Sequence, residues 1–255
     1  MRGYTVEQMR ESCAQKREWE KQFPLSHFVF RPISFYAASA VSRLTLSAPL
    51  VAAAGFAIAL AGLVALVLLG ELGPWPGITL LAVYALADAV DGNIARVTGT
   101  VTYYGRFLDG TLGILAEGVF FPALGAGLWL AGGTGTPFSS APMLHAVAGL
   151  SVLVLMLYSA LVEGGFGRYT IEKRKTEGSF EETLKKNIGS SRYRGSILYA
   201  VYLNAQAFTV QLLLLAVLTA AGRIGYFLPC MAGFYAAKFL FVTPYYLRRA
   251  SSELG

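Results

Sequence analysis

The chain has 255 residues, of which 55% are hydrophobic and only 14% charged, and its mean hydropathy of +0.53 is well above that of a soluble domain of this size. Its net charge of +6 comes from Lys and Arg that lie mainly in the N-terminal arm, in residues 168–194 and in the C-terminal tail. Nucleic-acid binding needs a basic stripe on an exposed folded face, so this distribution excludes a nucleic-acid partner and favours a membrane protein whose flanks meet anionic headgroups.

Residues 1–45 are predicted to form a cytosolic arm followed by a juxtamembrane amphipathic helix. The first 25 residues are polar and contain no apolar core, so we expect no cleavable signal. After Pro32, apolar side chains recur every three or four residues, at Ile33, Tyr36, Ala40, Val41 and Leu44. This spacing favours a helix lying in the membrane interface, and the alternative is the first turn of a long span. The two cysteines, Cys13 and Cys230, are far apart in sequence and indicate neither a disulfide framework nor a zinc site.

Residues 46–255 are predicted to form one all-α, polytopic membrane domain. Six apolar runs approach the roughly 20 residues that a helix needs to cross a bilayer. They cover about 46–69, 77–97, 103–130, 143–166, 195–221 and 226–247. Six spans place the N-terminal arm, the turn at 98–103, the 168–194 segment and the C-terminus on one side of the membrane. This side contains nearly all the Lys and Arg residues that lie outside the spans. The opposite side contains only Arg223, so the positive-inside rule predicts cytoplasmic termini.

Acidic and basic side chains cluster between the second and third apolar runs, over residues 85–117. Asp88 and Asp91 are three residues apart and share one face of a helix, and Asp109 lies on the next helix beyond a short turn. Carboxylates at membrane depth are costly and usually functional. Three of them converging near the cytoplasm would suit Mg²⁺ or Mn²⁺ bridging to phosphate oxygens.

Arginine and glycine accompany these aspartates. Arg96 and Arg106 could neutralise a phosphate, and Gly92 and Gly105 would let a nucleotide approach the backbone. The alternative is that the acids and arginines form structural ion pairs.

The string D-A-V-D-G-N-I-A-R, followed after eight residues by G-R-F-L-D, resembles the signature of the CDP-alcohol phosphotransferase family, D-x2-D-G-x2-A-R-x8-G-x3-D-x3-D. Residues that match at the required spacing are Asp88, Asp91, Gly92, Ala95, Arg96, Gly105 and Asp109. The six-span pattern is also similar to that family. The resemblance implies transfer of a substituted phosphate from a CDP-linked donor to an alcohol acceptor, in phospholipid biosynthesis, with release of CMP.

The resemblance also implies roles for the matching residues. Asp88, Asp91 and Asp109 would hold Mg²⁺ or Mn²⁺ at two sites. The same aspartates, with Gly92, Ala95, Arg96 and Gly105, would surround the CDP moiety. Membrane lipids and a second copy of the chain, in a homodimer, are the other partners that the resemblance implies.

The signature's last aspartate is replaced by Gly113. In the family that residue is the general base and a ligand of the second metal, so both functions are weakened here. Glu117 is a weak substitute, because eight helical residues place it roughly 12 Å along the axis from Asp109. Three explanations stay open: an engineered inactivating substitution, a natural enzyme with another base, or a relative that binds CDP and metal without turnover. A transporter using intramembrane acids is disfavoured by the nucleotide-type signature.

Other polar residues in or near the spans are secondary candidates. Lys238 is expected to pair with an acid or to bind an acceptor or donor phosphate, with snorkelling as the alternative. Arg106 and Arg192 are further phosphate candidates, as is Arg194, while Glu163 is either an acceptor-site residue or an interfacial charge. We expect His145 to be an interface residue, and Asn204, Gln206 and Gln211 to hydrogen-bond between helices.

Overall fold

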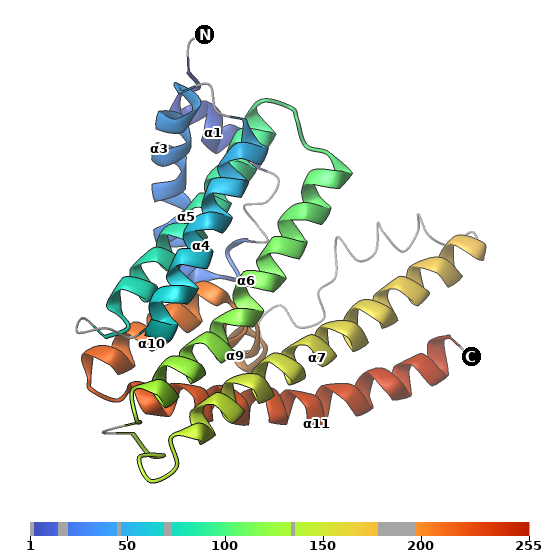
Figure 1. The fold of residues 1–255 in the computed structure, drawn as a ribbon. Coiled ribbons are helices and arrows are strands. Elements are labelled where there is room, and N and C mark those ends of the chain that lie inside the picture. Colours follow the sequence, from blue (N-terminus) through green and yellow to red (C-terminus); the bar gives the residue numbers. More distant parts are fainter. Residues whose placement is uncertain are drawn as a thin grey trace.

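The computed structural model of this chain describes residues 3–14, 20–44, 47–68, 73–133, 136–177 and 197–254, and every regular element in them is helical. The N-terminal part contains α1 (Val6–Ser12), a short π-helix η2 (Ser26–Phe30) and α3 (Arg31–Ser42) (Figure 1). The sequence prediction of a helix after Pro32 is confirmed. Ile33, Tyr36 and Ala40 lie on its exposed face, and Phe35 and Ala38 on its buried face. Its place in the membrane interface stays a prediction.

Five helices of the described residues are long and apolar enough to cross a membrane. They are α4 (Ala48–Leu68), α5 (Trp75–Val97), α6 (Tyr103–Leu130), α7 (Met143–Thr176) and α11 (Phe227–Glu253), the last preceded by the 3-10 turn η3 (Ile224–Tyr226). A sixth span results if α9 (Ile197–Ala205) and α10 (Phe208–Ala220) are counted together. The all-α polytopic fold is therefore confirmed.

The fifth predicted span is not one continuous helix, because α9 and α10 meet at a bend of 76°. Polar side chains at the bend bind backbone carbonyl groups that the break leaves without helical partners. The Gln211 side-chain amide donates to the Ala205 carbonyl oxygen at 3.0 Å, and that of Gln206 donates to the Tyr202 carbonyl oxygen at 3.2 Å. Such side-chain bonds let a broken helix persist at membrane depth. The expected interhelical bonds also exist, since Gln211 reaches the Tyr235 hydroxyl at 3.4 Å.

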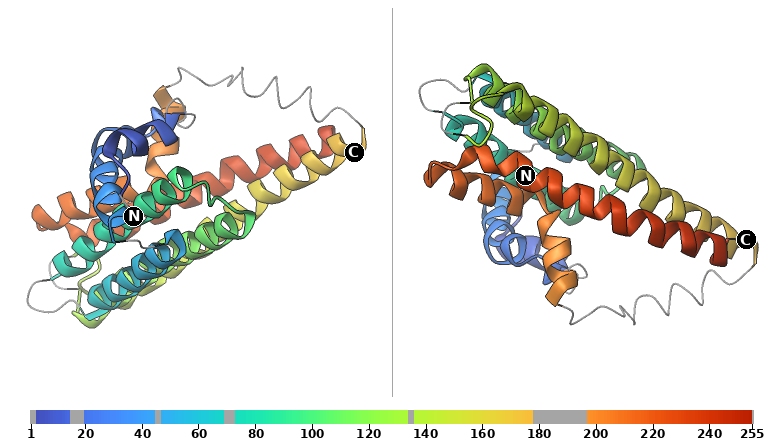
Figure 2. Two further views of the ribbon diagram at one scale, coloured as in Figure 1. Left: turned by 90° about the horizontal axis from the view of Figure 1, so that it is seen from above. Right: turned by 90° about the horizontal axis from the view of Figure 1, so that it is seen from below.

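Helix α7 continues to Thr176, ten residues beyond the predicted end of the fourth span. The extension packs beside the end of α11, and the two helices project together away from the other spans in both views of Figure 2. Phe166 packs against Tyr246, and Lys173 Nζ donates to the Glu253 carbonyl oxygen at 2.8 Å. These contacts, with the good helix propensity of Glu, Lys and Arg, explain why a charged segment continues the helix.

Small residues let the spans cross closely. A Cβ atom added to Gly77 would lie 3.0 Å from the carbonyl oxygen of Gly62, at the crossing of α5 and α4. At the crossing of α6 and α7, a Cβ atom on Gly125 would lie 2.5 Å from the carbonyl oxygen of His145. In lipid, such backbone approach supplies the packing that a hydrophobic driving force supplies in water.

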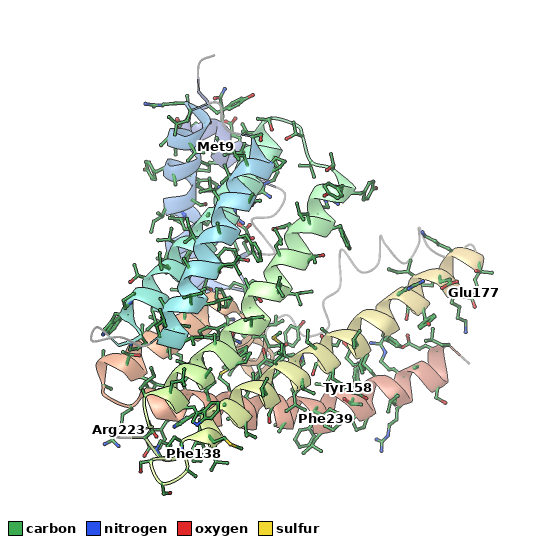
Figure 3. The ribbon with its side chains drawn as sticks, viewed as in Figure 1. Met9, Phe138, Tyr158, Glu177, Arg223 and Phe239 are labelled. Carbon is green, nitrogen blue, oxygen red and sulfur yellow. The ribbon has the colours of Figure 1, made fainter. Side chains whose placement is uncertain are left out.

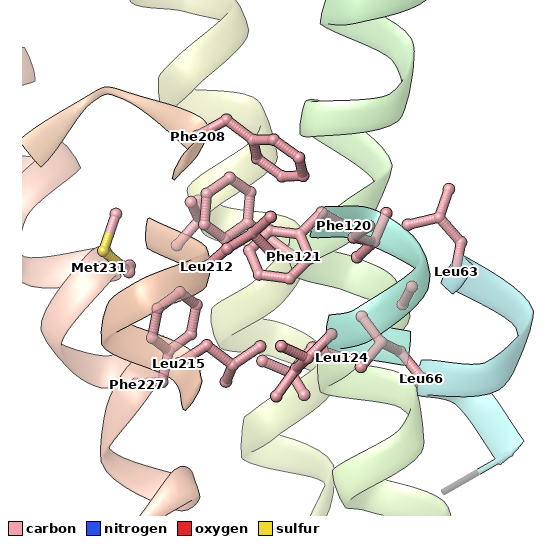
Figure 4. Packing of buried hydrophobic residues seen from close by; sticks show 14 of the residues in the cluster. Leu63, Leu66, Phe120, Phe121, Leu124, Phe208, Leu212, Leu215, Phe227 and Met231 are labelled. Atoms are coloured by element: carbon pink, nitrogen blue, oxygen red, sulfur yellow. The ribbon is translucent and has the colours of Figure 1, made fainter. Parts of the chain in front are cut away.

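A buried aromatic and aliphatic cluster joins α4, α5, α6, α10 and α11 (Figure 4). The Phe120 ring meets the Phe208 ring edge-on at 5.6 Å between centroids, and the Phe121 ring stacks on the Phe227 ring at 6.4 Å. These contacts hold α6 against its neighbours on the C-terminal side of the aspartate stretch.

The C-terminal end of α5 and the N-terminal end of α6 lie at the end of the molecule where α1 and α3 pack. Met9 of α1 marks this end in Figure 3, whereas Phe138 and Arg223 mark the opposite one. The aspartates therefore lie at the end of the molecule that carries the N-terminal arm.

Candidate functional site

A tight turn between α5 and α6 sets the geometry of the aspartate stretch. Gly99 adopts a φ of +68°, a left-handed conformation that favours glycine, and the Thr100 N–H donates to the Ala95 carbonyl oxygen at 2.9 Å. Thr102 then caps α6, its hydroxyl accepting from the Gly105 N–H at 2.9 Å. The turn therefore reverses the direction of the chain between α5 and α6, and both helices pack against α4.

The three signature aspartates come together across this turn. Asp91 lies six residues before Val97 and Asp109 six residues after Tyr103, so both stand about 9 Å from the turn along their helices. One carboxylate oxygen from each of Asp88, Asp91 and Asp109 lies within 4.8 Å of the other two. Asp91 is 9% exposed, whereas Asp88 and Asp109 are exposed.

This donor set fits a divalent cation. Mg²⁺ binds oxygen at about 2.1 Å, so two ligands on opposite sides of one ion lie about 4.2 Å apart. The three carboxylate oxygens lie within 4.8 Å of one another, which is close to this separation. Hard carboxylate oxygens are the ligands that Mg²⁺ and Mn²⁺ prefer. The residues present therefore suit the cation that the sequence predicts, and which ion binds stays a prediction.

The Arg96 side chain folds back along α5, so that its guanidinium lies beside Gly92, the residue after Asp91. A Cβ atom added to Gly92 would lie 3.2 Å from both terminal nitrogens of the Arg96 guanidinium, so a larger residue there would crowd the guanidinium. The guanidinium also donates through Nη2 to Asn93 Oδ1 at 2.8 Å. It is therefore held against the backbone one turn from the aspartates.

Ala95, Gly105 and Arg106 complete the residues predicted near a nucleotide. Ala95 is half-buried on α5 and Gly105 is exposed in the first turn of α6. The Arg106 guanidinium carbon lies 5.9 Å from the centroid of the Tyr103 ring, one turn closer to the start of α6 than Asp109. The phosphate role of Arg106 stays a prediction.

Gly113 faces a tyrosine that the sequence reasoning missed. A Cβ atom on Gly113 would meet the Tyr84 hydroxyl oxygen at 4.0 Å, and Tyr84 is only 6% exposed. The available signal was its position four residues before Asp88, on the same face of α5. Glu117 does not join the carboxylate cluster found in the described residues.

Lys238 pairs with an acid, as one of the sequence hypotheses predicted. Its Nζ lies 2.9 Å from Glu163 Oε1 and donates to Gln206 Oε1 at 2.5 Å, so α7, α11 and the α9–α10 bend meet at this group.

His145 is fully buried and its Nε2 lies 2.8 Å from the Thr136 hydroxyl, which gives it a structural contact in the 131–142 loop. Arg192 and Arg194 lie outside the described residues.

Comparison with known proteins decides the family. A model of the CDP-alcohol phosphatidyltransferase family matches residues 43–222, which include the turn and all three aspartates. The chain belongs to this family. The match begins after α3 and ends before α11, so the arm and the last helix lie outside it.

Two curated relatives carry the same printed name, phosphatidylinositol phosphate synthase. The protein from Streptomyces avermitilis is 42% identical over 57 residues, which are 22% of either chain. The one from Mycolicibacterium smegmatis is 37% identical over 102 residues, covering 39% of this chain and 43% of the relative. The matched stretches therefore span less than half the length of either relative.

Proposed function

We propose that this member of the CDP-alcohol phosphatidyltransferase family transfers a substituted phosphate from a CDP-linked donor to an alcohol hydroxyl and releases CMP, as a step of phospholipid biosynthesis. The observation that carries the proposal is the convergence of Asp88, Asp91 and Asp109 within 4.8 Å, at the signature spacing and in a chain of this family. The donor is CDP-diacylglycerol or a soluble CDP-alcohol, because the signature concerns the CDP moiety that both share.

The protein's own groups bind and orient the donor. Asp88, Asp91 and Asp109 would hold one or two divalent ions. When bound, Mg²⁺ or Mn²⁺ neutralises the diphosphate and makes CMP a better leaving group. The Arg96 guanidinium supplies a planar pair of N–H donors to a phosphate. The bare backbone at Gly92 and Gly105 leaves room for the nucleotide.

The chemical step joins the acceptor hydroxyl oxygen to the phosphorus that carries the donor's substituent, and the bond from that phosphorus to the CMP oxygen breaks. CMP takes the electron pair, and the hydroxyl proton must leave. In the family, a carboxylate takes this proton, and this chain has Gly113 at the position of that carboxylate. Positioning and charge stabilisation supply most of the rate in phosphoryl transfer. A base adds 10²–10⁴-fold, so its loss slows the reaction without abolishing it.

A second candidate function is binding of CDP and metal without turnover. The observation that favours it is Gly113 itself, because Glu117, the nearest substitute carboxylate in the sequence, does not join the cluster of three aspartates found among the described residues. Under this alternative the chain would sequester a CDP-linked lipid or act as a partner of an active enzyme.

Location and assembly follow from the same proposal. Both termini and the aspartates face the cytoplasm, where magnesium and CTP-derived nucleotides are available, and the chain is an integral membrane protein. A homodimer would cover part of the apolar helix surface. Membrane lipids are its surroundings and the source of a lipid substrate.

A donor and acceptor screen tests the proposal. The purified chain is placed in lipid nanodiscs with Mg²⁺ or Mn²⁺, and CMP release is measured from CDP-diacylglycerol and CDP-alcohols. The acceptors are glycerol phosphate, serine, inositol, diacylglycerol and, because of the relatives' names, inositol phosphate. Acceptor-dependent CMP release supports the enzyme. Metal-dependent CDP binding with no CMP release from any pair would favour the binding protein instead.

A further inference from the structure

The N-terminal arm packs directly on the helix that carries the first two signature aspartates. Met9 of α1 and Phe35 of α3 share a buried apolar cluster with Val90 and Ile94 of α5. The arm nevertheless lies outside the residues that match the family model. A segment that the family match does not include therefore forms one wall of the signature helix.

A polar network within this packing converges on Asn93, which is fully buried on α5. Its Oδ1 accepts from Arg31 Nη1 of α3 at 3.0 Å, from the thiol of Cys13 at 3.2 Å and from Arg96 Nη2 at 2.8 Å. Its Nδ2 donates to the Ser34 hydroxyl at 2.9 Å. Both polar atoms of the Asn93 side chain are thus bound to the arm, α3 or Arg96.

Arg96 also contacts the arm directly, because its Nε donates to Cys13 Sγ at 3.2 Å. Cys13 is 4% exposed. Two separate N–H groups of the guanidinium are therefore used by Asn93 and Cys13, which fixes both the position and the plane of the group.

Arg31 is itself held by an acid of the arm. Glu20 is 6% exposed, and both its carboxylate oxygens pair with the Arg31 guanidinium, with Nε donating to Oε2 at 3.1 Å. A bidentate arginine–carboxylate pair is strong and directional. Since the same guanidinium reaches Asn93, the ion pair orients the network from the arm's side.

We propose that Cys13, Glu20 and Arg31 are positioning residues that fix the Arg96 guanidinium for the diphosphate of a CDP-linked donor. This inference rests on the proposed function, because it assigns the arm to the nucleotide site. Without the arm, the long Arg96 side chain is free to turn toward the aspartate carboxylates or solvent. Supporting groups that orient a site residue commonly change affinity by 10–100-fold when removed.

A double-mutant cycle tests whether Arg31 acts on CDP binding through Arg96. Dissociation constants for CDP with saturating Mg²⁺ are measured on the full-length protein in nanodiscs for wild type, Arg31→Ala, Arg96→Ala and the double variant. Arg31→Ala is expected to weaken CDP binding about tenfold in the wild-type background and less than twofold in the Arg96→Ala background. Ser39→Ala is the matched control. It removes the 2.8 Å bond from Ser39 to the Tyr4 carbonyl oxygen, an arm contact outside the network, and should change affinity less than twofold.

Thermal melting shows whether Arg31→Ala lowers the folded fraction of the protein. In that case substitutions of Cys13, which remove fewer atoms, provide a second test. Cys13→Ala removes one donor and one acceptor and should weaken CDP binding about fivefold. Cys13→Ser retains both roles and should recover most of the affinity.

The outcomes separate the two claims. A wild-type chain that binds no CDP overturns the proposed function. If the wild type binds CDP, equal losses for Arg31→Ala with and without Arg96 overturn only the positioning role. Equal affinities of Cys13→Ala and Cys13→Ser would also overturn it.

Discussion

Gly113 leaves a gap beside Tyr84 in an otherwise complete signature. The structure places only the Tyr84 hydroxyl oxygen, at 4.0 Å, near a Cβ added there. An aspartate side chain therefore fits with ordinary van der Waals contact. Gly113 lies one turn after Asp109 on α6, so a carboxylate there would face the same region as the aspartate cluster.

Gly113→Asp is expected to raise the rate of CMP release about 100-fold, because it restores a carboxylate that can accept the acceptor's proton. CDP affinity should change less than about threefold. Gly110→Asp is the matched control, since it adds a carboxylate to α6 outside the signature and its Cβ also meets open space. Steady-state CMP release measures both. Equal rates for the two variants would contradict the assignment of position 113.

The ion pair between Lys238 and Glu163 is expected to contribute to the stability of the fold. Lys238 is 7% exposed and is paired to Glu163, which is about one-third exposed. Lys238→Met is expected to lower the unfolding free energy by about 2 kcal/mol, because it leaves Glu163 without its cation. Adding Glu163→Gln should recover about 1 kcal/mol of this loss. Unfolding in mixed SDS micelles measures both, and additive losses would show that the pair contributes nothing.

At the scale of single residues, the sequence predicted the aspartate cluster because its members lie close in sequence around one turn. Asp88, Asp91 and Asp109 meet because a short turn reverses the chain between α5 and α6. Cys13, Arg31 and Tyr84 were missed as site neighbours. The first two reach α5 through tertiary packing across about 60 to 80 residues, which periodicity does not encode.

Among the elements, the α6–α7 pair depends most on glycine. Backbone atoms of each helix occupy the space where a Cβ on Gly125 or Gly149 would project. The spans themselves were predictable from hydropathy within a few residues at most ends. The 76° bend between α9 and α10 was not, because Asn204, Gln206 and Gln211 are also compatible with a straight span. The extension of α7 depends on contacts with α11, which the sequence pattern does not reveal.

Gly149→Ala is expected to destabilise the fold by about 2 kcal/mol, since the added methyl group would meet the backbone at Phe121 and Pro122. Gly164→Ala, on the same helix, should be neutral or slightly stabilising because nothing lies within 4 Å of its Cβ position. Thermal melting in detergent compares them. Equal melting temperatures of the two variants would argue against the close α6–α7 crossing.

The whole molecule is an all-α bundle whose arm, aspartate turn and C-terminus lie away from the 131–142 loop and Arg223. Nearly all Lys and Arg outside the spans are on the arm's side of the predicted topology, so the positive-inside rule predicts that this side is cytoplasmic. The aspartates would then meet their nucleotide donor without any transport step.

A reporter fused to the C-terminus tests this orientation in a bacterial host. A cytoplasmically active reporter should be active there, and a periplasmically active one should be silent. Fusion after residue 140 in the 131–142 loop should give the reverse pattern. The same pattern at both positions would contradict the six-span topology.

Metal-dependent CDP binding is the most direct measurement of the central claim, because both candidate functions require it. Calorimetric titration of the wild type with CDP should show binding that depends on Mg²⁺ or Mn²⁺ and disappears with a chelator. Asp88→Asn and Asp109→Asn should each remove it, because a neutral amide is a weak ligand for a hard cation. Glu172→Gln, an exposed acid on α7, is the matched control and should bind normally. Unchanged CDP binding in both aspartate variants would contradict the assignment of this site.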